Sequence, residues 1–168
     1  MIFIQSQSKD AAFHFAAEEY CMANLCDTKD VFLIWQTGRC AMLGSNQIAQ
    51  DGLDLEMAKK EHVQIVRRSS GGGTIYTDPG TILCTCITKF DPSVDAKEAG
   101  RNHLSVPIVA ALKTMGVNAQ IKGRNDVLIA DQKISGLAQR ISKQLLCSHC
   151  SLLYDANLSI LGNILTVD

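Results

Sequence analysis

The chain has 168 residues, of which 46% are hydrophobic and 20% charged, and its formal net charge is −1. This composition is typical of one globular domain with its own core. The balanced charge argues against a nucleic-acid-binding protein, which usually carries clustered excess Lys and Arg. No apolar run approaches the roughly 20 residues of a membrane-spanning helix, and the N-terminus lacks the features of a secretory signal, so we expect a cytoplasmic protein.

The first elements in chain order are a strand over residues 1–7 and a helix. Asp10 is the predicted N-cap of that helix, which runs to about Asn24. Its buried face is expected to carry the apolar residues that recur at helical spacing, which are Phe13, Ala16, Ala17 and Tyr20.

Short apolar runs predict the strands that follow. The runs 31–35 and 40–43 lie on either side of Thr37-Gly38 and are expected to pair with each other. Asp78-Pro79-Gly80 predicts a turn between two later strands. Besides the first pair, this part is expected to hold a short helix over 53–61 and strands over 62–66, 74–76 and 82–88.

A longer helix is predicted over residues 96–115, with Gly116 at its C-terminal end and a kink or late start at Pro107. Its apolar face is expected to contain Leu104, Ile108, Ala111, Leu112 and Met115. Asp131-Gln132 predicts a hairpin between strands over 127–130 and 133–138. A strand over 144–154 and a helix through residue 165, capped by Asn157 or Ser159, complete the prediction.

Strands and helices interleave without the strict alternation of a parallel βαβ fold. We therefore predict an α+β fold, with a mixed or antiparallel sheet and helices packed on one side. No linker-like segment divides the chain, so residues 1–168 are expected to form a single domain.

The chain contains seven cysteines, an odd number, and most lie in apolar segments. Buried thiols in a reducing cytosol are the expected state. A zinc site is the alternative, built from Cys147, His149 and Cys150 together with Cys84 and Cys86.

A glycine run, Arg67-Arg68-Ser69-Ser70-Gly71-Gly72-Gly73-Thr74, follows a predicted strand. Successive glycines allow the backbone to approach a ligand closely, and their N–H groups can form a nest for an anion. The two arginines supply planar donors suited to phosphate. The run indicates an anion-binding loop, with a flexible surface turn as the alternative. Neither the P-loop nor the dinucleotide-binding spacing is present.

A second cluster of polar residues surrounds the predicted hairpin. Asn125 and Asp126 lie at the start of its first strand and Lys133 at the start of its second. A lysine fixed on a strand can hold a phosphate or a carboxylate as a point charge. Gly136 would allow a ligand or another backbone to come close. A solvated hairpin lysine is the alternative.

The two clusters together resemble the lipoate–protein ligase A family, within the biotin/lipoate ligase superfamily. The strongest matches are Arg67-Arg68-Ser-Ser-Gly-Gly-Gly-Thr-Ile-Tyr76 with Asp78, and Gly123-Arg-Asn-Asp126 through Lys133-Ile-Ser-Gly136. The resemblance extends over residues 10–165, including segments 10–20, 33–36, 44–47, 149–155 and 158–159.

The resemblance implies a fold similar to the catalytic domains of class II aminoacyl-tRNA synthetases and biotin protein ligases. It also implies an enzyme that uses ATP and Mg²⁺ to convert lipoate into lipoyl-adenylate, and that then transfers the lipoyl group to a lysine of a carrier domain. The expected carriers are the lipoyl domains of 2-oxoacid dehydrogenase E2 subunits or the glycine cleavage H protein.

The same resemblance implies roles for individual residues. Lys133 would be the catalytic residue that bridges the phosphate and the acyl carbonyl. Asp126 would have a magnesium-linked or structural role. The residues expected to bind ATP or lipoyl-adenylate are Arg68, Gly71, Gly72, Gly73, Thr74, Ile75, Tyr76, Asn125, Asp126 and Lys133.

The sequence departs from the family pattern at a few positions. Ser45 stands where a basic residue is frequent, Ser148 where a histidine is frequent, and Cys150 where glycine is usual, so lipoate and octanoate are both candidate substrates. Family members also continue well beyond this length. We therefore expect that the C-terminal accessory domain is absent, that a separate polypeptide can supply it, and that the chain by itself binds adenylate or transfers acyl groups but activates lipoate poorly.

Two other functions compete with a ligase. An octanoyl or lipoyl transferase of the same superfamily would work through a cysteine thioester without ATP, but no cysteine here clearly matches its nucleophile. A non-catalytic module that binds an adenylate or a partner protein is the other alternative.

Overall fold

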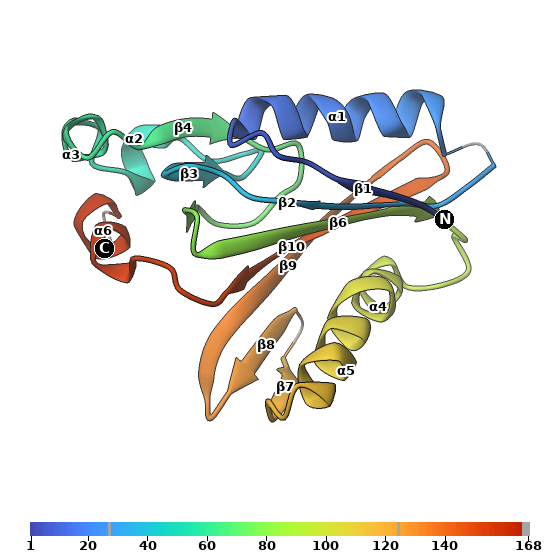
Figure 1. Cartoon of the computed structure of the whole chain (residues 1–168). Helices are drawn as coiled ribbons and strands as arrows, with labels where there is room; N and C mark the ends of the chain where they lie inside the picture. The colour runs from blue at the N-terminus through green and yellow to red at the C-terminus, as the bar shows by residue number, and fades with distance from the viewer. Residues whose placement is uncertain (27, 124, 166–168) are drawn as a thin grey trace.

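The computed structural model describes residues 1–26, 28–123 and 125–165 (Figure 1). Within these residues the strands form a large sheet, in the order β1-β2-β6-β10-β9-β8-β7, and a small sheet, in the order β4-β3-β5. The large sheet contains β1 (Ile2–Gln5), β2 (Val31–Trp35), β6 (Thr81–Lys89), β7 (Ala119–Lys122), β8 (Asp126–Ile129), β9 (Gln132–Ser142) and β10 (Leu145–Leu153). The small sheet contains β3 (Cys40–Leu43), β4 (Gln64–Arg67) and β5 (Ile75–Thr77). The helical segments are α1 (Ala11–Asn24), α2 (Ala49–Gly52), α3 (Leu55–Lys60), α4 (Ala96–Gly100), η1 (Arg101–Ser105), α5 (Val106–Thr114) and α6 (Leu158–Ile164).

Both sheets mix strand directions, which confirms the predicted α+β class with a mixed sheet. In the large sheet β1 and β2 run parallel, whereas β2, β6, β10, β9, β8 and β7 follow one another in antiparallel pairs. In the small sheet β3 runs parallel to β4 and antiparallel to β5.

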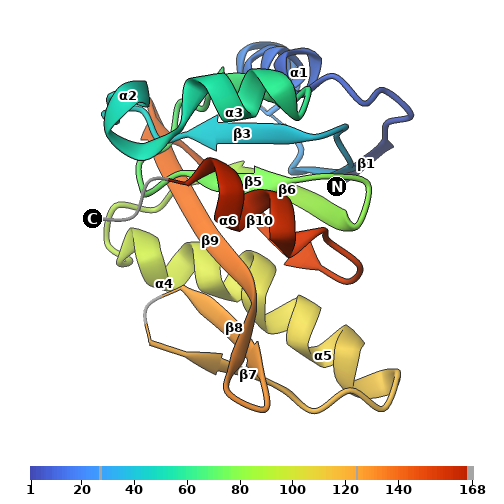
Figure 2. The ribbon, with the colours of Figure 1, turned by 90° about the vertical axis from the view of Figure 1, so that its left-hand side faces the viewer.

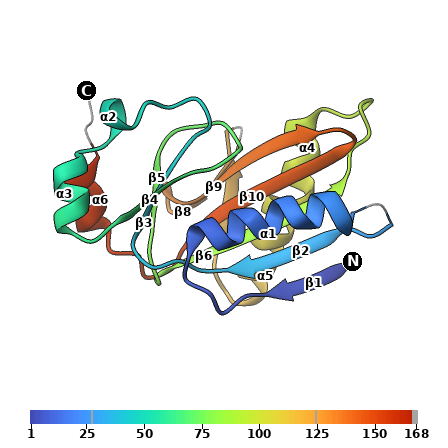
Figure 3. The same cartoon turned by 90° about the horizontal axis from the view of Figure 1, so that it is seen from above.

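Helices cover both faces of the large sheet, so the prediction that they pack on one side was wrong. Helix α1 lies on one face, and α4, η1 and α5 lie on the other (Figures 1 and 3). Strand β6 is buried on both sides because its alternate residues face these two layers. Leu83 and Ile87 pack in the core under α1, whereas Cys84 and Cys86 pack with Leu104 of η1 in the opposite core.

Helix α1 has the predicted boundaries, and the Asp10 side chain accepts a hydrogen bond from the Ala12 amide at 3.0 Å. The predicted buried stripe was wrong, because Phe13 and Tyr20 are 54% and 61% exposed. The buried face instead carries Ala11, His14, Glu18 and Cys21. Polar residues can occupy it because the sheet supplies hydrogen-bond and stacking partners that no apolar pattern reveals.

Strands β2 and β3 form as predicted but do not pair with each other. β2 lies between β1 and β6, and β3 lies between β4 and β5. The segment around Thr37-Gly38 therefore carries the chain from one sheet to the other. The small sheet packs with α3 and α6 around a second core that contains Leu43, Tyr76 and Ile160, at one end of the large sheet (Figure 2).

The long helix around Pro107 is interrupted as expected. A π-helical turn, η1, separates α4 from α5, and Pro107, which has no N–H to donate, is the second residue of α5. Gly116 follows the helix with φ of +81°, as predicted for its end. The predicted apolar face holds only in part, because Leu104 is buried while Met115 is 75% exposed.

The predicted hairpin is confirmed as β8 and β9, which pair antiparallel across a turn at Ala130 and Asp131, both with positive φ. The next strand, β10, and the last helix, α6, also form where predicted, and the Asn157 side chain caps α6. In the described part of the chain no helix is long and apolar enough to cross a bilayer.

Candidate functional site

A cavity of about 240 Å³ lies where the glycine run faces strands β9 and β10. Its mouth carries charged and polar groups from the glycine run and from the β8–β9 hairpin, and its interior is lined by aromatic and aliphatic side chains such as Phe15, Trp35 and Leu83. Seven residues predicted from the sequence lie on its wall, namely Arg68, Gly72, Gly73, Thr74, Ile75, Asn125 and Lys133. The two clusters that are far apart in the sequence therefore meet at one cavity.

The two arginines of the glycine run hold the loop itself. The guanidinium of Arg68 is buried and donates to the carbonyl oxygens of Met42, Gly71 and Gly73, at 2.7, 2.8 and 2.7 Å. Arg67 donates to the carbonyl oxygens of Gly44 and Gln47, in the loop after β3. The sequence predicted these side chains as phosphate donors. In the structure they bind main-chain carbonyls and shape the loop.

Arg68 also lines the cavity, and one of its nitrogen atoms makes no hydrogen bond to the described residues. Its Nε atom is buried and has no hydrogen-bond partner among the described residues. Burial also lowers the pKa of the Arg68 guanidinium.

A second loop, Gly44–Gln47, supports the glycine run from behind. Gly44 has no room for a side chain, because a Cβ atom there would collide with the carbonyl oxygen of Gly72. The Gln47 Oε1 atom accepts hydrogen bonds from the Gly44 amide and from the Thr74 hydroxyl, at 2.8 and 3.0 Å. Gly72 has φ of +96°, which favours glycine. These contacts place the amides of the run at a fixed position on the cavity wall.

Lys133 lies opposite the glycine run, on β9. Its Nζ atom is 2.8 Å from Oδ1 of Asp126 on the neighbouring strand β8. A register shift between Val127 and Leu128 brings the two side chains to the same edge of the hairpin. Gly136 makes room for the lysine, since a Cβ atom there would lie 3.3 Å from Lys133 Cε and 3.4 Å from its Nζ.

Asn125 fastens the start of the hairpin to β9. Its side-chain amide donates to the carbonyl oxygen of Leu137 at 2.8 Å, and the Leu137 amide donates to the Asn125 carbonyl at 2.9 Å. The neighbouring Arg124 of the predicted motif lies outside the described residues.

Three of the ten predicted binding residues do not line this cavity, and one of them, Asp126, is the ion-pair partner of Lys133. Gly71 lines an adjacent hollow together with Lys97 and Gln139. Tyr76 points into the core of the small sheet, where it is 6% exposed and where burial raises the pKa of its hydroxyl to about 12. Successive side chains of a strand point to opposite faces, so Tyr76 of β5 faces away from the cavity that Ile75 lines.

A chain of buried polar residues begins at the cavity wall, and the sequence analysis did not predict it. His149 Nε2 and Ser70 Oγ are 2.5 Å apart, and His149 Nδ1 is 3.5 Å from Oε1 of Glu18. Thr85 Oγ1 donates to the same Glu18 oxygen at 2.5 Å and accepts from Trp35 Nε1 at 3.1 Å. The signal available in the sequence was the pair of polar residues at helical spacing in α1, His14 and Glu18.

The zinc site considered from the cysteine spacing does not assemble as such. Cys147 belongs to the core under α1, whereas Cys84, Cys86 and Cys150 belong to the opposite core. Alternate residues of β6 and β10 face opposite sides of the sheet, so the five residues are divided between two faces. All seven cysteines are buried, as expected.

Residues 10–168 match the family described as "Lipoyl protein ligase A/B catalytic domain". The chain is 32% identical over 157 residues to lipoate–protein ligase LplJ of Bacillus subtilis, covering 93% of this chain and 46% of that protein. It is also 32% identical over 169 residues to lipoate–protein ligase 1 of Staphylococcus aureus, covering 100% of this chain and 51% of that protein. The chain thus spans about half the length of the curated relatives that it matches.

Solved structures agree with this fold. The bi-partite lipoate–protein ligase of Thermoplasma acidophilum, described with its E2 lipoyl domain, superposes with a TM-score of 0.89 at 24% identity, covering 99% of this chain and 66% of that one. The lipoate complex of LipL1 from P. falciparum superposes with a TM-score of 0.88 at 24% identity, covering 98% of this chain and 51% of that one.

Proposed function

Since the chain belongs to the lipoyl protein ligase A/B catalytic domain family, we propose that it takes part in ATP-dependent attachment of lipoate to a carrier protein. In the proposed reaction the lipoate carboxylate attacks the α-phosphorus of ATP, and pyrophosphate leaves. The amine of a carrier lysine then attacks the acyl carbonyl of lipoyl-adenylate, and AMP leaves. The relatives named as lipoate–protein ligases support this proposal.

The single observation that carries the proposal is the meeting of the glycine run and Lys133 at one cavity. The apolar interior, with Phe15, Trp35 and Leu83, suits an aliphatic acyl chain. The cavity wall also includes the backbone of Gly72 and Gly73 and the side chain of Lys133. An acyl-adenylate has the matching arrangement, with an apolar tail joined to an anionic phosphate.

Lys133 is the proposed catalytic residue. Its ammonium would contact both the phosphate and the acyl carbonyl oxygen, where negative charge develops as the carrier amine attacks. A positioned cation at that point stabilises the transition state more than the ground state. No side-chain nucleophile is needed, because the mixed anhydride is already activated.

Asp126 is proposed to position Lys133. Its carboxylate holds the ammonium by the 2.8 Å ion pair, which favours this role over a place in a magnesium site. Mg²⁺ is the proposed ion for the activation step, in which it would neutralise the phosphate charge of ATP. An Asp126 ligand to this magnesium ion would be the carboxylate oxygen that does not contact Lys133.

The transferase alternative needs a cysteine that is accessible and readily ionised. Among the described cysteines, Cys150 lines the cavity. Its hydrogen bond with Cys84, together with burial, raises the pKa of the Cys150 thiol well above the usual value. A protonated thiol is a poor nucleophile, so this geometry favours the ligase.

Carrier proteins and location complete the proposal. The proposed carriers are the lipoyl domains of 2-oxoacid dehydrogenase E2 subunits or the glycine cleavage H protein, in line with the E2 lipoyl domain described for the Thermoplasma acidophilum ligase. A cytoplasmic location stays a prediction, supported by the buried cysteines.

A lipoylation assay on a lipoyl domain tests the proposal in two arms. One arm supplies lipoate and ATP, and the other supplies preformed lipoyl-adenylate. We expect transfer in the second arm, which bypasses the activation step and tests binding and transfer alone. Failure of the 168-residue chain to bind lipoyl-adenylate or to transfer from it would contradict the proposal.

A further inference from the structure

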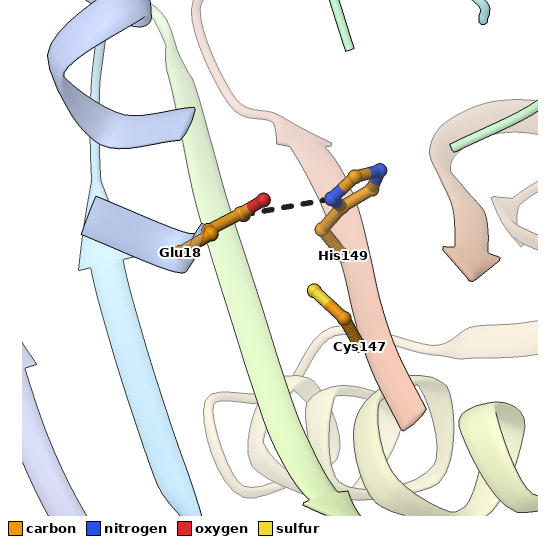
Figure 4. Close-up of side chains that lie close together, drawn as sticks. All are labelled: Glu18, Cys147 and His149. Atoms are coloured by element: carbon orange, nitrogen blue, oxygen red, sulfur yellow. Dashed lines mark ion pairs between the residues drawn. The ribbon is translucent and has the colours of Figure 1, made fainter. Parts of the chain in front are cut away.

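Glu18 of α1 and Cys147 and His149 of β10 point toward one another behind the cavity wall (Figure 4). One potential ligand atom from each lies within 4.8 Å of the others. The three residues are 1%, 0% and 8% exposed. The ion-pair partner of the Glu18 carboxylate is His149, which is cationic only when protonated. A buried carboxylate in this setting is costly without a compensating cation.

We propose that Glu18, Cys147 and His149 form a binding site for a divalent transition metal, for which Zn²⁺ is the best match. One oxygen, one nitrogen and one sulfur donor are the ligand types that Zn²⁺ accepts in proteins. Three protein ligands would leave one coordination position open. Because His149 also lines the main cavity, the bound ion would lie at the cavity wall.

The existing spacing already fits two of the three ligands. Two donors that each lie about 2.0–2.1 Å from a tetrahedral zinc are roughly 3.4 Å apart. His149 Nδ1 and Glu18 Oε1 are 3.5 Å apart. A sulfur at about 2.3 Å from the ion would lie roughly 3.6 Å from the other donors, so Cys147 Sγ would need to approach by about 1.2 Å at most from the present limit of 4.8 Å.

The surrounding hydrogen bonds orient the ligands toward this point. His149 Nε2 is engaged by Ser70 Oγ, and His149 Nδ1 is buried without a hydrogen-bond partner among the described residues. Thr85 holds the Glu18 carboxylate. Metal-binding histidines and carboxylates are commonly fixed in this way by outer partners.

The charges also balance. A cysteine thiol carries one proton, which must leave when the sulfur binds a metal ion. Zn²⁺ would form a bond to the sulfur and release that proton to solvent. The resulting cluster of carboxylate, thiolate, neutral imidazole and Zn²⁺ has no net charge, which suits a buried position.

Titration of the metal-free chain with Co²⁺, followed by displacement with Zn²⁺, tests the site. We expect one ion per chain and a near-ultraviolet charge-transfer band from a cobalt–thiolate bond. Cys147→Ser should abolish the band, and Glu18→Gln should weaken binding at least about tenfold, the range seen when metal-site partners are removed. Cys86→Ser, a buried cysteine of β6 in the opposite core, is the matched control and should keep the band.

A readout on the unaltered chain avoids dependence on variant folding. Zn²⁺ should raise its thermal unfolding midpoint in a saturable manner, because only the folded chain presents the site. The proposal is overturned if the unaltered chain shows no saturable binding, or if Cys147→Ser folds and binds with equal affinity, which would mean an adventitious surface ion only. Neither measurement depends on acyl transfer, so the ligase proposal is tested separately.

Discussion

The Lys133 ammonium and the Asp126 carboxylate form an ion pair of 2.8 Å across the β8–β9 hairpin, at the mouth of the cavity. The two side chains are 57% and 34% exposed, so solvent screens much of their attraction. Such a pair contributes little to stability, about 0–1 kcal/mol. The main effect of the ion pair is to fix the position of the Lys133 ammonium.

Asp126→Asn separates positioning from stability. The amide keeps the shape of the side chain but loses its charge, so Lys133 should be held less firmly. We expect the thermal midpoint to change little and the rate of transfer from lipoyl-adenylate to fall by about tenfold, corresponding to about 1.4 kcal/mol of transition-state stabilisation. A transfer rate equal to that of the unaltered chain would show that Asp126 does not position the lysine.

Gly136→Ala tests the space beside Lys133. The new methyl group would lie 3.3–3.4 Å from the lysine Cε and Nζ, so the lysine side chain must shift from its present position. We expect reduced transfer with the fold retained. Gly162→Ala is the matched control, since no atom lies within 4 Å of the added methyl group and the residue is within helix α6. It should raise the free energy of unfolding by about 0.5–1 kcal/mol and leave transfer unchanged.

Ser70→Ala removes the hydroxyl that holds His149. Both residues are buried, and the loss leaves a ring nitrogen without its 2.5 Å partner. We expect the free energy of unfolding, measured by denaturant titration, to fall by about 1–3 kcal/mol. Ser69→Ala, at an exposed position next in the run, should change it by less than about 0.5 kcal/mol. Equal effects at the two positions would contradict the hydrogen-bonded arrangement.

His14 makes stability depend on pH. Burial of its ring against Trp35 lowers the pKa of His14 below the ordinary value of 6.5, and the hydrogen bond to the Ser8 carbonyl oxygen offsets only part of this effect. As the pH falls below about 6.5 the unfolded chain binds a proton that the folded chain resists, so the free energy of unfolding decreases toward pH 5.

His14→Gln should flatten that decrease between about pH 7 and pH 5, in denaturant titrations at several pH values. His62→Asn is the control at an exposed histidine with positive φ, a backbone conformation that asparagine accepts. In His62→Asn the free energy of unfolding should still decrease toward pH 5. If the free energy of unfolding decreases as steeply in His14→Gln as in the unaltered chain, His14 is not the cause of this pH dependence.

Local signals predicted most of the elements. The Asp10 cap, the turn at Asp78-Pro79-Gly80, the hairpin at Asp131 and the helix interruption near Pro107 depend on backbone chemistry that adjacent residues determine. The partners of a strand depend on segments that are far away in the sequence. The sequence alone therefore did not reveal that β2 and β3 pair with other strands and not with each other. Burial on both faces of β6 likewise follows from two helical layers that no local pattern reveals.

In the candidate site, too, local patterns were predictable from the sequence, whereas contacts between distant segments were not. Glycine and lysine patterns brought together Gly72, Gly73 and Lys133, which line one cavity. The pattern did not reveal that Arg68 would bind main-chain carbonyls, because that depends on how the loop folds around it. Glu18 and His149 were not predicted as neighbours, since they meet only when α1 packs on β10.

Single-turnover transfer from preformed lipoyl-adenylate to a lipoyl domain, compared between the unaltered chain and Lys133→Ala, tests the central claim most directly. The side chain is largely exposed, so the variant should fold, and Lys113→Ala at an exposed position of α5 is the matched control. The account predicts transfer slowed at least about a hundredfold in Lys133→Ala, or about 2.7 kcal/mol, and unchanged transfer in the control. Transfer by Lys133→Ala at the rate of the unaltered chain would contradict the account.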